Sequence, residues 1–129
     1  MSSSQKPAPG SITWTDLTVP NADEVRSFYQ AVVGWKTTPV SMGQYDDYSM
    51  NEAESGAPVT GICHARGVNA DIPPQWLVYI TVKNLDESLL QCIKHGGLAL
   101  GEVRALDGSG RFCVIQDPSG AVAALFEAT

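Results

Sequence analysis

The sequence predicts an α+β domain in which a βαβββ module occurs twice. Three observations support this fold class. The order of predicted elements repeats after about half of the 129 residues, each half carries the same helix-capping pattern, and residues 111–127 have the composition of a hairpin. We expect a pseudo-twofold axis between the two modules. Their curved mixed sheets should form a concave cup, with the helices on the convex side.

The first module begins with a strand and a well-marked helix. Residues 11–19 alternate as in a strand, which Pro20 ends. Asn21 is a favoured helix N-cap, Glu24 follows at the spacing of a capping box, and Gly34 stands where a C-cap glycine belongs. Three further strands are predicted, at residues 35–42, 44–50 and 59–64.

The second module repeats this order after a linker. Residues 66–74 show no periodicity and end in Pro-Pro, which is typical of a linker. A strand at residues 76–82 precedes a helix that starts after Asn84 and stops at the pair Gly96 and Gly97. Three strands complete the module, at residues 98–106, 111–116 and 121–126.

A superposition of the two halves supports the repeat. Shifting the chain by about half its length brings capping residues onto one another. The matched pairs are Asn21 with Asn84, Glu24 with Glu87 and Gly34 with Gly97. The same shift carries Gly61, in the fourth strand, onto Ala124 in the last strand.

The most specific local signal is the turn Asp117-Pro118-Ser119-Gly120 between the last two strands. Asp accepts hydrogen bonds from the backbone beyond it, Pro presets φ, and Gly tolerates a left-handed conformation. The apolar runs on both sides are short and rich in small and β-branched residues, which favours strands. The turn therefore fixes the register of the final strand.

Composition excludes several classes of partner. The net charge of −6 disfavours nucleic acid, and no apolar run approaches the roughly 20 residues that span a bilayer. Residues 1–10 lack the apolar stretch of a secretory signal, so we expect a flexible tail there. The three cysteines show no CxxC spacing, and reduced thiols in a cytoplasmic protein are the simplest account of them.

Three segments together resemble the vicinal oxygen chelate superfamily, which includes glyoxalase I, extradiol dioxygenases and the bleomycin-resistance proteins. They are residues 16–35, residues 76–88 with 95–97, and residues 110–127. The resemblance implies one domain over residues 11–129 and favours a homodimer. Its parts would be module 1 (11–65), the linker (66–74) and module 2 (75–129).

The resemblance also implies where a metal would bind. Metal-using members hold a divalent ion through His, Glu or Gln, with one ligand on the first and one on the fourth strand of each module. The matching positions here are Trp14, Gly61, Leu77 and Ala124. None of these side chains can ligate a metal ion. We therefore expect no metal and no other cofactor.

Aromatic residues are expected around the cup instead. Trp14, Tyr79 and Phe126 have the strand parity of the cup face, and Tyr48 on a neighbouring strand joins them. With Asp16 and Ala124, these residues make up the predicted ligand-binding set. Such a cup suits a small, flat or apolar molecule, although aromatic rings can equally fill a core.

Asp16 leaves an enzymatic alternative open. It could act as the general base of a metal-free isomerase, or it could be a solvated acid or the ion-pair partner of Arg111. A slipped register would bring Cys63 or His64 to a ligand position, which would allow a metal-dependent lyase or dioxygenase with relocated ligands. The simpler interpretation is a buried thiol and a histidine at the rim.

Overall fold

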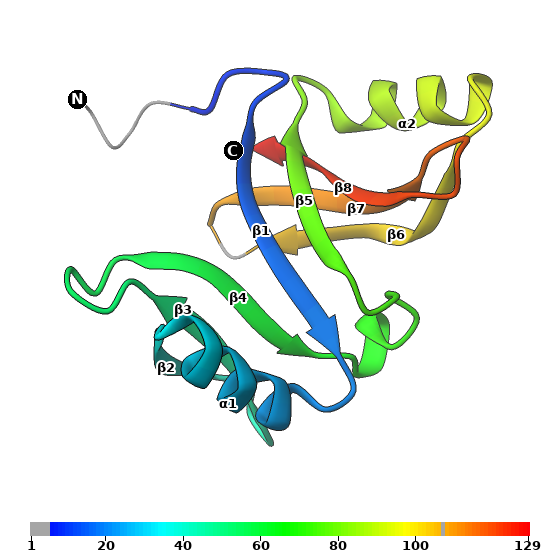
Figure 1. Cartoon of the computed structure of the whole chain (residues 1–129). Coiled ribbons are helices and arrows are strands. Elements are labelled where there is room, and N and C mark those ends of the chain that lie inside the picture. Colours follow the sequence, from blue (N-terminus) through cyan, green and yellow to red (C-terminus); the bar gives the residue numbers. More distant parts are fainter. Residues whose placement is uncertain (1–5, 107) are drawn as a thin grey trace. The chain divides into compact units, whose positions relative to one another are not determined.

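The computed structural model describes residues 6–106 and 108–129 (Figure 1). The chain divides into two compact units. Trp14–Trp76 form what we call the first unit, and Leu77–Thr129 together with the residues up to Thr13 form the second unit. The fold is α+β with a βαβββ order in each half of the chain, which confirms the predicted fold class.

The first unit follows the predicted element order. Its elements are β1 (Ile12–Val19), α1 (Ala22–Val33), β2 (Lys36–Ser41), β3 (Asp46–Asn51), β4 (Pro58–His64) and the 3₁₀ turn η1 (Gly67–Asn69). The strands are ordered β2-β3-β4-β1; β1 and β4 run parallel and the other neighbours antiparallel. The turn η1 lies within the residues that the sequence marks as a linker.

The second unit repeats this arrangement. Its elements are β5 (Trp76–Thr81), α2 (Leu85–Lys94), β6 (Leu98–Leu106), β7 (Gly110–Gln116) and β8 (Val122–Ala128). The strands are ordered β5-β8-β7-β6, with β5 parallel to β8 (Figure 1). No helix in the described part of the chain is long and apolar enough to cross a membrane.

The predicted tail, residues 1–10, lies partly outside the described residues. Its described end is held in the second unit, where the Gly10 amide donates to the Thr81 carbonyl at 2.7 Å. The Thr81 amide in turn donates to the Ser11 carbonyl at 2.8 Å. These bonds anchor the chain next to β5 immediately before β1 begins.

The two helix caps differ in detail. The Asn84 side chain accepts a hydrogen bond from the Glu87 amide at 3.0 Å, as predicted for an N-cap. Asn21 also occupies the N-cap position, but its Nδ2 donates to the Glu24 carboxylate at 3.0 Å and makes no bond to the helix backbone. At the other end of α1, Gly34 takes the predicted left-handed conformation, with φ of 86°.

The turn between β7 and β8 has the predicted chemistry. The Asp117 carboxylate accepts hydrogen bonds from the Ser119 amide at 2.8 Å and the Ala121 amide at 3.1 Å. Gly120 has a φ of 93°, which a residue with a side chain rarely adopts. Hydrogen bonds to Ser119 lower the pKa of the Asp117 carboxyl, so this group stays ionised to lower pH than an ordinary aspartate.

The sheet register confirms the predicted repeat. In the first unit Asp16 on β1 pairs with Gly61 on β4, and in the second unit Tyr79 on β5 pairs with Ala124 on β8. Tyr79 lies 63 positions after Asp16, and Ala124 lies 63 positions after Gly61. The shift that the sequence predicts therefore holds to the residue within both parallel strand pairs.

Each helix covers one face of its own sheet. Around α1, the buried cluster includes Leu17, Val19, Met50 and Ile62; around α2 it includes Leu85, Cys113 and Leu125. Because side chains alternate along a strand, the neighbouring residues point to the opposite face of each sheet. We call this opposite face the helix-free face of each unit.

Candidate functional site

The helix-free face of the first unit carries the acid that the sequence singles out. A Cβ added at Gly61 would lie 3.5 Å from the Asp16 Cβ and 3.8 Å from the Cys63 Sγ, so these three residues share one face. Trp14, two residues before Asp16 on β1, has the same parity and is 37% exposed. The structure thus brings Trp14, Asp16 and Cys63 to one side of the sheet.

Cys63 is a neutral thiol on this face. Burial raises its pKa, and the carboxylates of Asp16 and Asp47 raise it further. Only a thiolate is an effective nucleophile, so the environment of Cys63 opposes that role at neutral pH. Cys63 pairs with Thr18 on β1, two residues beyond the pair of Asp16 and Gly61 and therefore on the same face.

Tyr48 does not share the face of Asp16, which corrects the sequence prediction. On β3 it pairs with Ile62 of β4, and both belong to the buried cluster under α1. Asp16 and Gly61 have the opposite parity. Sequence alone places Tyr48 on a strand, but only the pairing of β3 with β4 shows which face it occupies.

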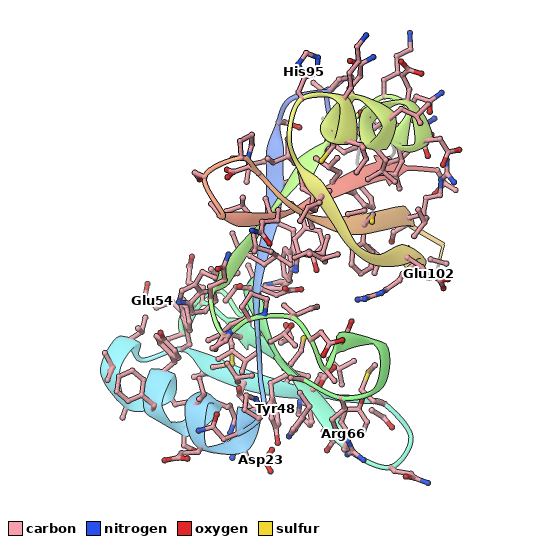
Figure 2. The ribbon with its side chains drawn as sticks, turned by 90° about the vertical axis from the view of Figure 1, so that its right-hand side faces the viewer. Asp23, Tyr48, Glu54, Arg66, His95 and Glu102 are labelled. Atoms are coloured by element: carbon pink, nitrogen blue, oxygen red, sulfur yellow. The ribbon has the colours of Figure 1, made fainter. Side chains whose placement is uncertain are left out.

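The Tyr48 ring is held by groups from α1 instead. Its hydroxyl donates to the Asp23 carboxylate, and the Arg26 guanidinium lies 4.6 Å from its ring centroid. Figure 2 shows the labelled Asp23 and Tyr48 next to each other. The hydrogen bond to Asp23 is the main reason that the pKa of Tyr48 is raised, because the bond favours the protonated phenol.

Replacing Tyr48 by phenylalanine should destabilise the protein modestly. The lost hydrogen bond has a charged acceptor, but Asp23 is largely exposed, so we expect a loss of about 1 kcal/mol. The pKa of the Tyr48 phenol is higher in the folded protein than in the unfolded chain, where it is about 10. The hydrogen bond therefore stabilises the protein fully below about pH 10, and this stabilisation is lost as the pH rises through the pKa of the folded protein. Urea unfolding of both proteins at pH 7 and pH 11 measures it. A difference that grows at alkaline pH would contradict this account.

His64 lies close to two carboxylates that come from different elements of the first unit. Its Nδ1 lies 3.4 Å from Asp47, its Nε2 lies 3.5 Å from Asp23, and its backbone amide donates to Asp47 at 2.8 Å. Its alternation with Cys63 puts its ring on the face opposite Asp16. The sequence does not predict this polar cluster, because Asp23 lies in the first turn of α1 and Asp47 lies in β3, and no local sequence motif links the two.

The helix-free face of the second unit is aromatic and closely packed. The rings of Tyr79 and Phe112 lie 5.5 Å apart, and Phe126 pairs with Phe112 across β7 and β8. Ala124 is fully buried between Tyr79 on β5 and Val114 on β7. Tyr79, Ala124 and Phe126 of the predicted set therefore lie on neighbouring strands of one sheet, with Phe112 as a member that the sequence analysis missed.

Arg111 has carboxylate partners within the second unit. Its Nε donates to Glu127 at 2.6 Å, and a terminal nitrogen donates to Asp86 at 3.1 Å. These bonds join β7 to β8 and to the start of α2. They make Arg111 part of the framework of this sheet.

The described residues of the two units do not meet the needs of a metal site. Among residues 6–106 and 108–129, no three His, Cys, Asp or Glu side chains form a group that could hold a metal ion. The positions that the family resemblance marks for ligands carry Trp14 and Gly61 in the first unit and Leu77 and Ala124 in the second. The donor set present does not fit the divalent ion of metal-using relatives.

These features define a class of protein: an α+β fold of two βαβββ modules, with an aromatic helix-free face and one partly buried acid. A family model described as the Glyoxalase/Bleomycin resistance protein/Dioxygenase superfamily matches residues 11–125. The chain belongs to this superfamily. Solved structures show a similar fold: methylmalonyl-CoA epimerase from Mycobacterium tuberculosis is 15% identical and covers 98% of this chain and 94% of its own, with a TM-score of 0.57.

Sequence relatives are longer proteins. The putative glyoxylase CFP32 of Mycobacterium tuberculosis is 28% identical over 113 residues, which are 88% of this chain and 42% of that protein. The anthracycline biosynthesis protein DnrV of Streptomyces peucetius is 28% identical over 92% of this chain and 47% of its own length. The chain thus spans less than half the length of these curated relatives.

Proposed function

We propose that this protein binds a small, flat or apolar molecule on its helix-free faces and does so without a resident metal ion. The observation that carries the proposal is the strand register. It sets Gly61 opposite Asp16 and Ala124 opposite Tyr79. Gly61 and Ala124 are two of the positions at which the family resemblance implies metal ligands. A hydrogen and a methyl group at these positions provide no side-chain donor for a metal ion.

The composition of the two faces supports an apolar, flat ligand. Trp14 supplies an exposed ring on the first unit, and Tyr79 and Phe126 supply rings on the second. Flat molecules gain from stacking on such rings as well as from burial. The Asp16 carboxylate could orient a hydroxyl or amine of the ligand.

A binding titration tests this function. We expect 2-naphthol, a flat apolar probe, to shift the amide resonances of Trp14, Asp16 and Gly61 in the first unit and of Tyr79 and Ala124 in the second. Chelator should leave the titration unchanged. If the shifts fell only on helix residues, or if chelator abolished them, the proposal would be wrong.

An enzymatic function is the second candidate, and Asp16 is the observation that favours it. It is a partly buried carboxylate beside a neutral thiol, and methylmalonyl-CoA epimerases are among the similar structures. In a metal-free isomerase it would remove a proton next to a carbonyl. A lyase or dioxygenase with relocated metal ligands is the other enzymatic reading.

Asp16→Asn separates binding from catalysis. If Asp16 is a general base, the variant should exchange the C2 proton of methylmalonyl-CoA with D₂O at least ~100-fold more slowly than the parent protein, while 2-naphthol binding persists. If Asp16 only lines the face, the parent protein shows no exchange, and the dissociation constants of 2-naphthol for the variant and the parent protein agree within about threefold. Mass spectrometry follows the exchange.

We further propose that residues 11–129 act as one cytoplasmic domain that forms a homodimer. The sheet edges support pairing because β2 and β6 expose apolar side chains with little charge, among them Val40, Leu98 and Val103. All three cysteines are free, as expected for a reducing compartment. Light scattering on the purified protein gives the oligomeric state.

A further inference from the structure

The second unit contains an open cleft on its helix-covered side. The cleft lies between α2 and the turn that joins β7 to β8, and its volume is about 400 Å³, within the range of small-molecule sites. Its floor is apolar and consists of Val82, Ile115 and Leu125. This is the opposite face of the sheet from Tyr79 and Ala124, so the cleft is separate from the faces of the proposed function.

The helix side of the cleft is polar for a reason visible in the sequence. Ser88, Gln91, Cys92 and His95 follow one another at helical spacing and therefore lie along one stripe of α2. Figure 2 labels His95 at the end of this helix. The neighbouring stripe, which includes Leu89, packs into the core. Beneath the small and polar side chains of the first stripe, Val82 and Ile115 are only partly buried.

The charges around the cleft are acidic. Glu87 and Asp117 are among its lining residues, and no lysine or arginine of the described residues lines it. Asp117 is ionised at neutral pH like other aspartates, and hydrogen bonds from Ser119 lower its pKa further. Gln91 donates to the Glu87 carboxylate at 3.3 Å, which keeps this carboxylate near the helix stripe. A ligand with a positive charge matches this rim, whereas an anion would be repelled.

We propose that this cleft is a second binding site, and that it takes a small apolar molecule carrying an amine. The apolar body would cover Val82, Ile115 and Leu125, and the ammonium group would point toward Glu87 and Asp117. The occupant is thus an arylalkylamine or a compound of similar chemistry. Its binding requires neither a metal nor the helix-free faces.

Cys92 provides a built-in reporter of occupancy. It lines the cleft and is partly exposed, whereas Cys113 is buried and the pKa values of Cys113 and Cys63 are raised. N-ethylmaleimide should therefore react first at Cys92, as mass spectrometry can verify. Benzylamine at millimolar concentration should slow this reaction. Benzyl alcohol should protect less, and phenylacetate should need an at least ~10-fold higher concentration for equal protection.

Two variants make the test specific. Ser88→Phe places a phenyl ring in the cleft and should abolish protection, whereas Leu90→Phe places the same ring at an exposed position of α2 and should not. Glu87→Gln should reduce the preference for benzylamine over benzyl alcohol about threefold. If Ser88→Phe fails to fold, this change in preference alone tests whether the amine binds in the cleft. Equal protection by phenylacetate, no protection by benzylamine, or an unchanged preference in Glu87→Gln would overturn the proposal.

Discussion

Ala124→Glu should destabilise the protein by about 4 kcal/mol, because it buries a carboxylate without a cationic partner. The Ala124 side chain is fully buried, and its neighbours across the strands are Tyr79 and Val114, neither of which carries a positive charge. Urea unfolding at pH 7 measures the loss. The destabilisation should decrease as the pH falls toward 4, since the buried carboxyl then folds in its neutral form.

The matched control is Ala121→Glu, which adds the same charge to the same hairpin at an exposed position. We expect it to change stability by less than about 0.5 kcal/mol. Zn²⁺ or Ni²⁺ should not restore the stability of Ala124→Glu, because the other positions that the family resemblance marks for metal ligands carry Trp14, Gly61 and Leu77. Recovery on addition of either ion would mean that the remaining ligands of a metal site are present.

Gly110→Ala should cost about 3 kcal/mol or more, because the start of β7 has no room for a Cβ atom. A Cβ at this position would lie 2.1 Å from the Glu127 carbonyl oxygen and 3.0 Å from the Ala128 Cα. Both contacts are with the backbone of β8, which cannot move away without separating the strand ends. In addition, Gly110 has a φ of 146°, which residues with side chains rarely adopt.

Gly61→Ala is the control for this substitution. Its added Cβ would make ordinary contacts, at 3.5 Å from the Asp16 Cβ and 3.6 Å from the Tyr48 carbonyl oxygen. We expect a change within about 0.5 kcal/mol by urea unfolding. A loss of several kcal/mol at Gly61, or none at Gly110, would contradict the packing described for these two sheets.

Local signals predict most of the fold. Helix α2 begins after the predicted cap Asn84, and the turn from Asp117 to Gly120 has the hydrogen bonds that its residue types suggest. Both depend on chemistry within a few residues, which a sequence displays directly. The repeat then extends this information, since the pairing of Tyr79 with Ala124 gives the pairing of Asp16 with Gly61.

The candidate site is predicted less completely, because it depends on pairing between strands. Tyr48 was assigned to the wrong face since nothing local fixes how β3 aligns with β4, and a shift of one residue reverses every side chain. Asp23 and Asp47 meet at His64 from a helix and a strand that lie far apart in the sequence. Neither the face that Tyr48 occupies nor the contacts of His64 with Asp23 and Asp47 can be predicted without the pairing register of the strands.

The metal content of the protein tests the central claim most directly. The protein should be purified without chelator, and its divalent metals measured by inductively coupled plasma mass spectrometry beside Asp16→Asn and Trp14→Ala. We predict well under one ion per chain in all three, because Gly61 and Ala124 offer no donor atoms. A stoichiometric ion in the parent protein that either variant loses would contradict a metal-independent binding function.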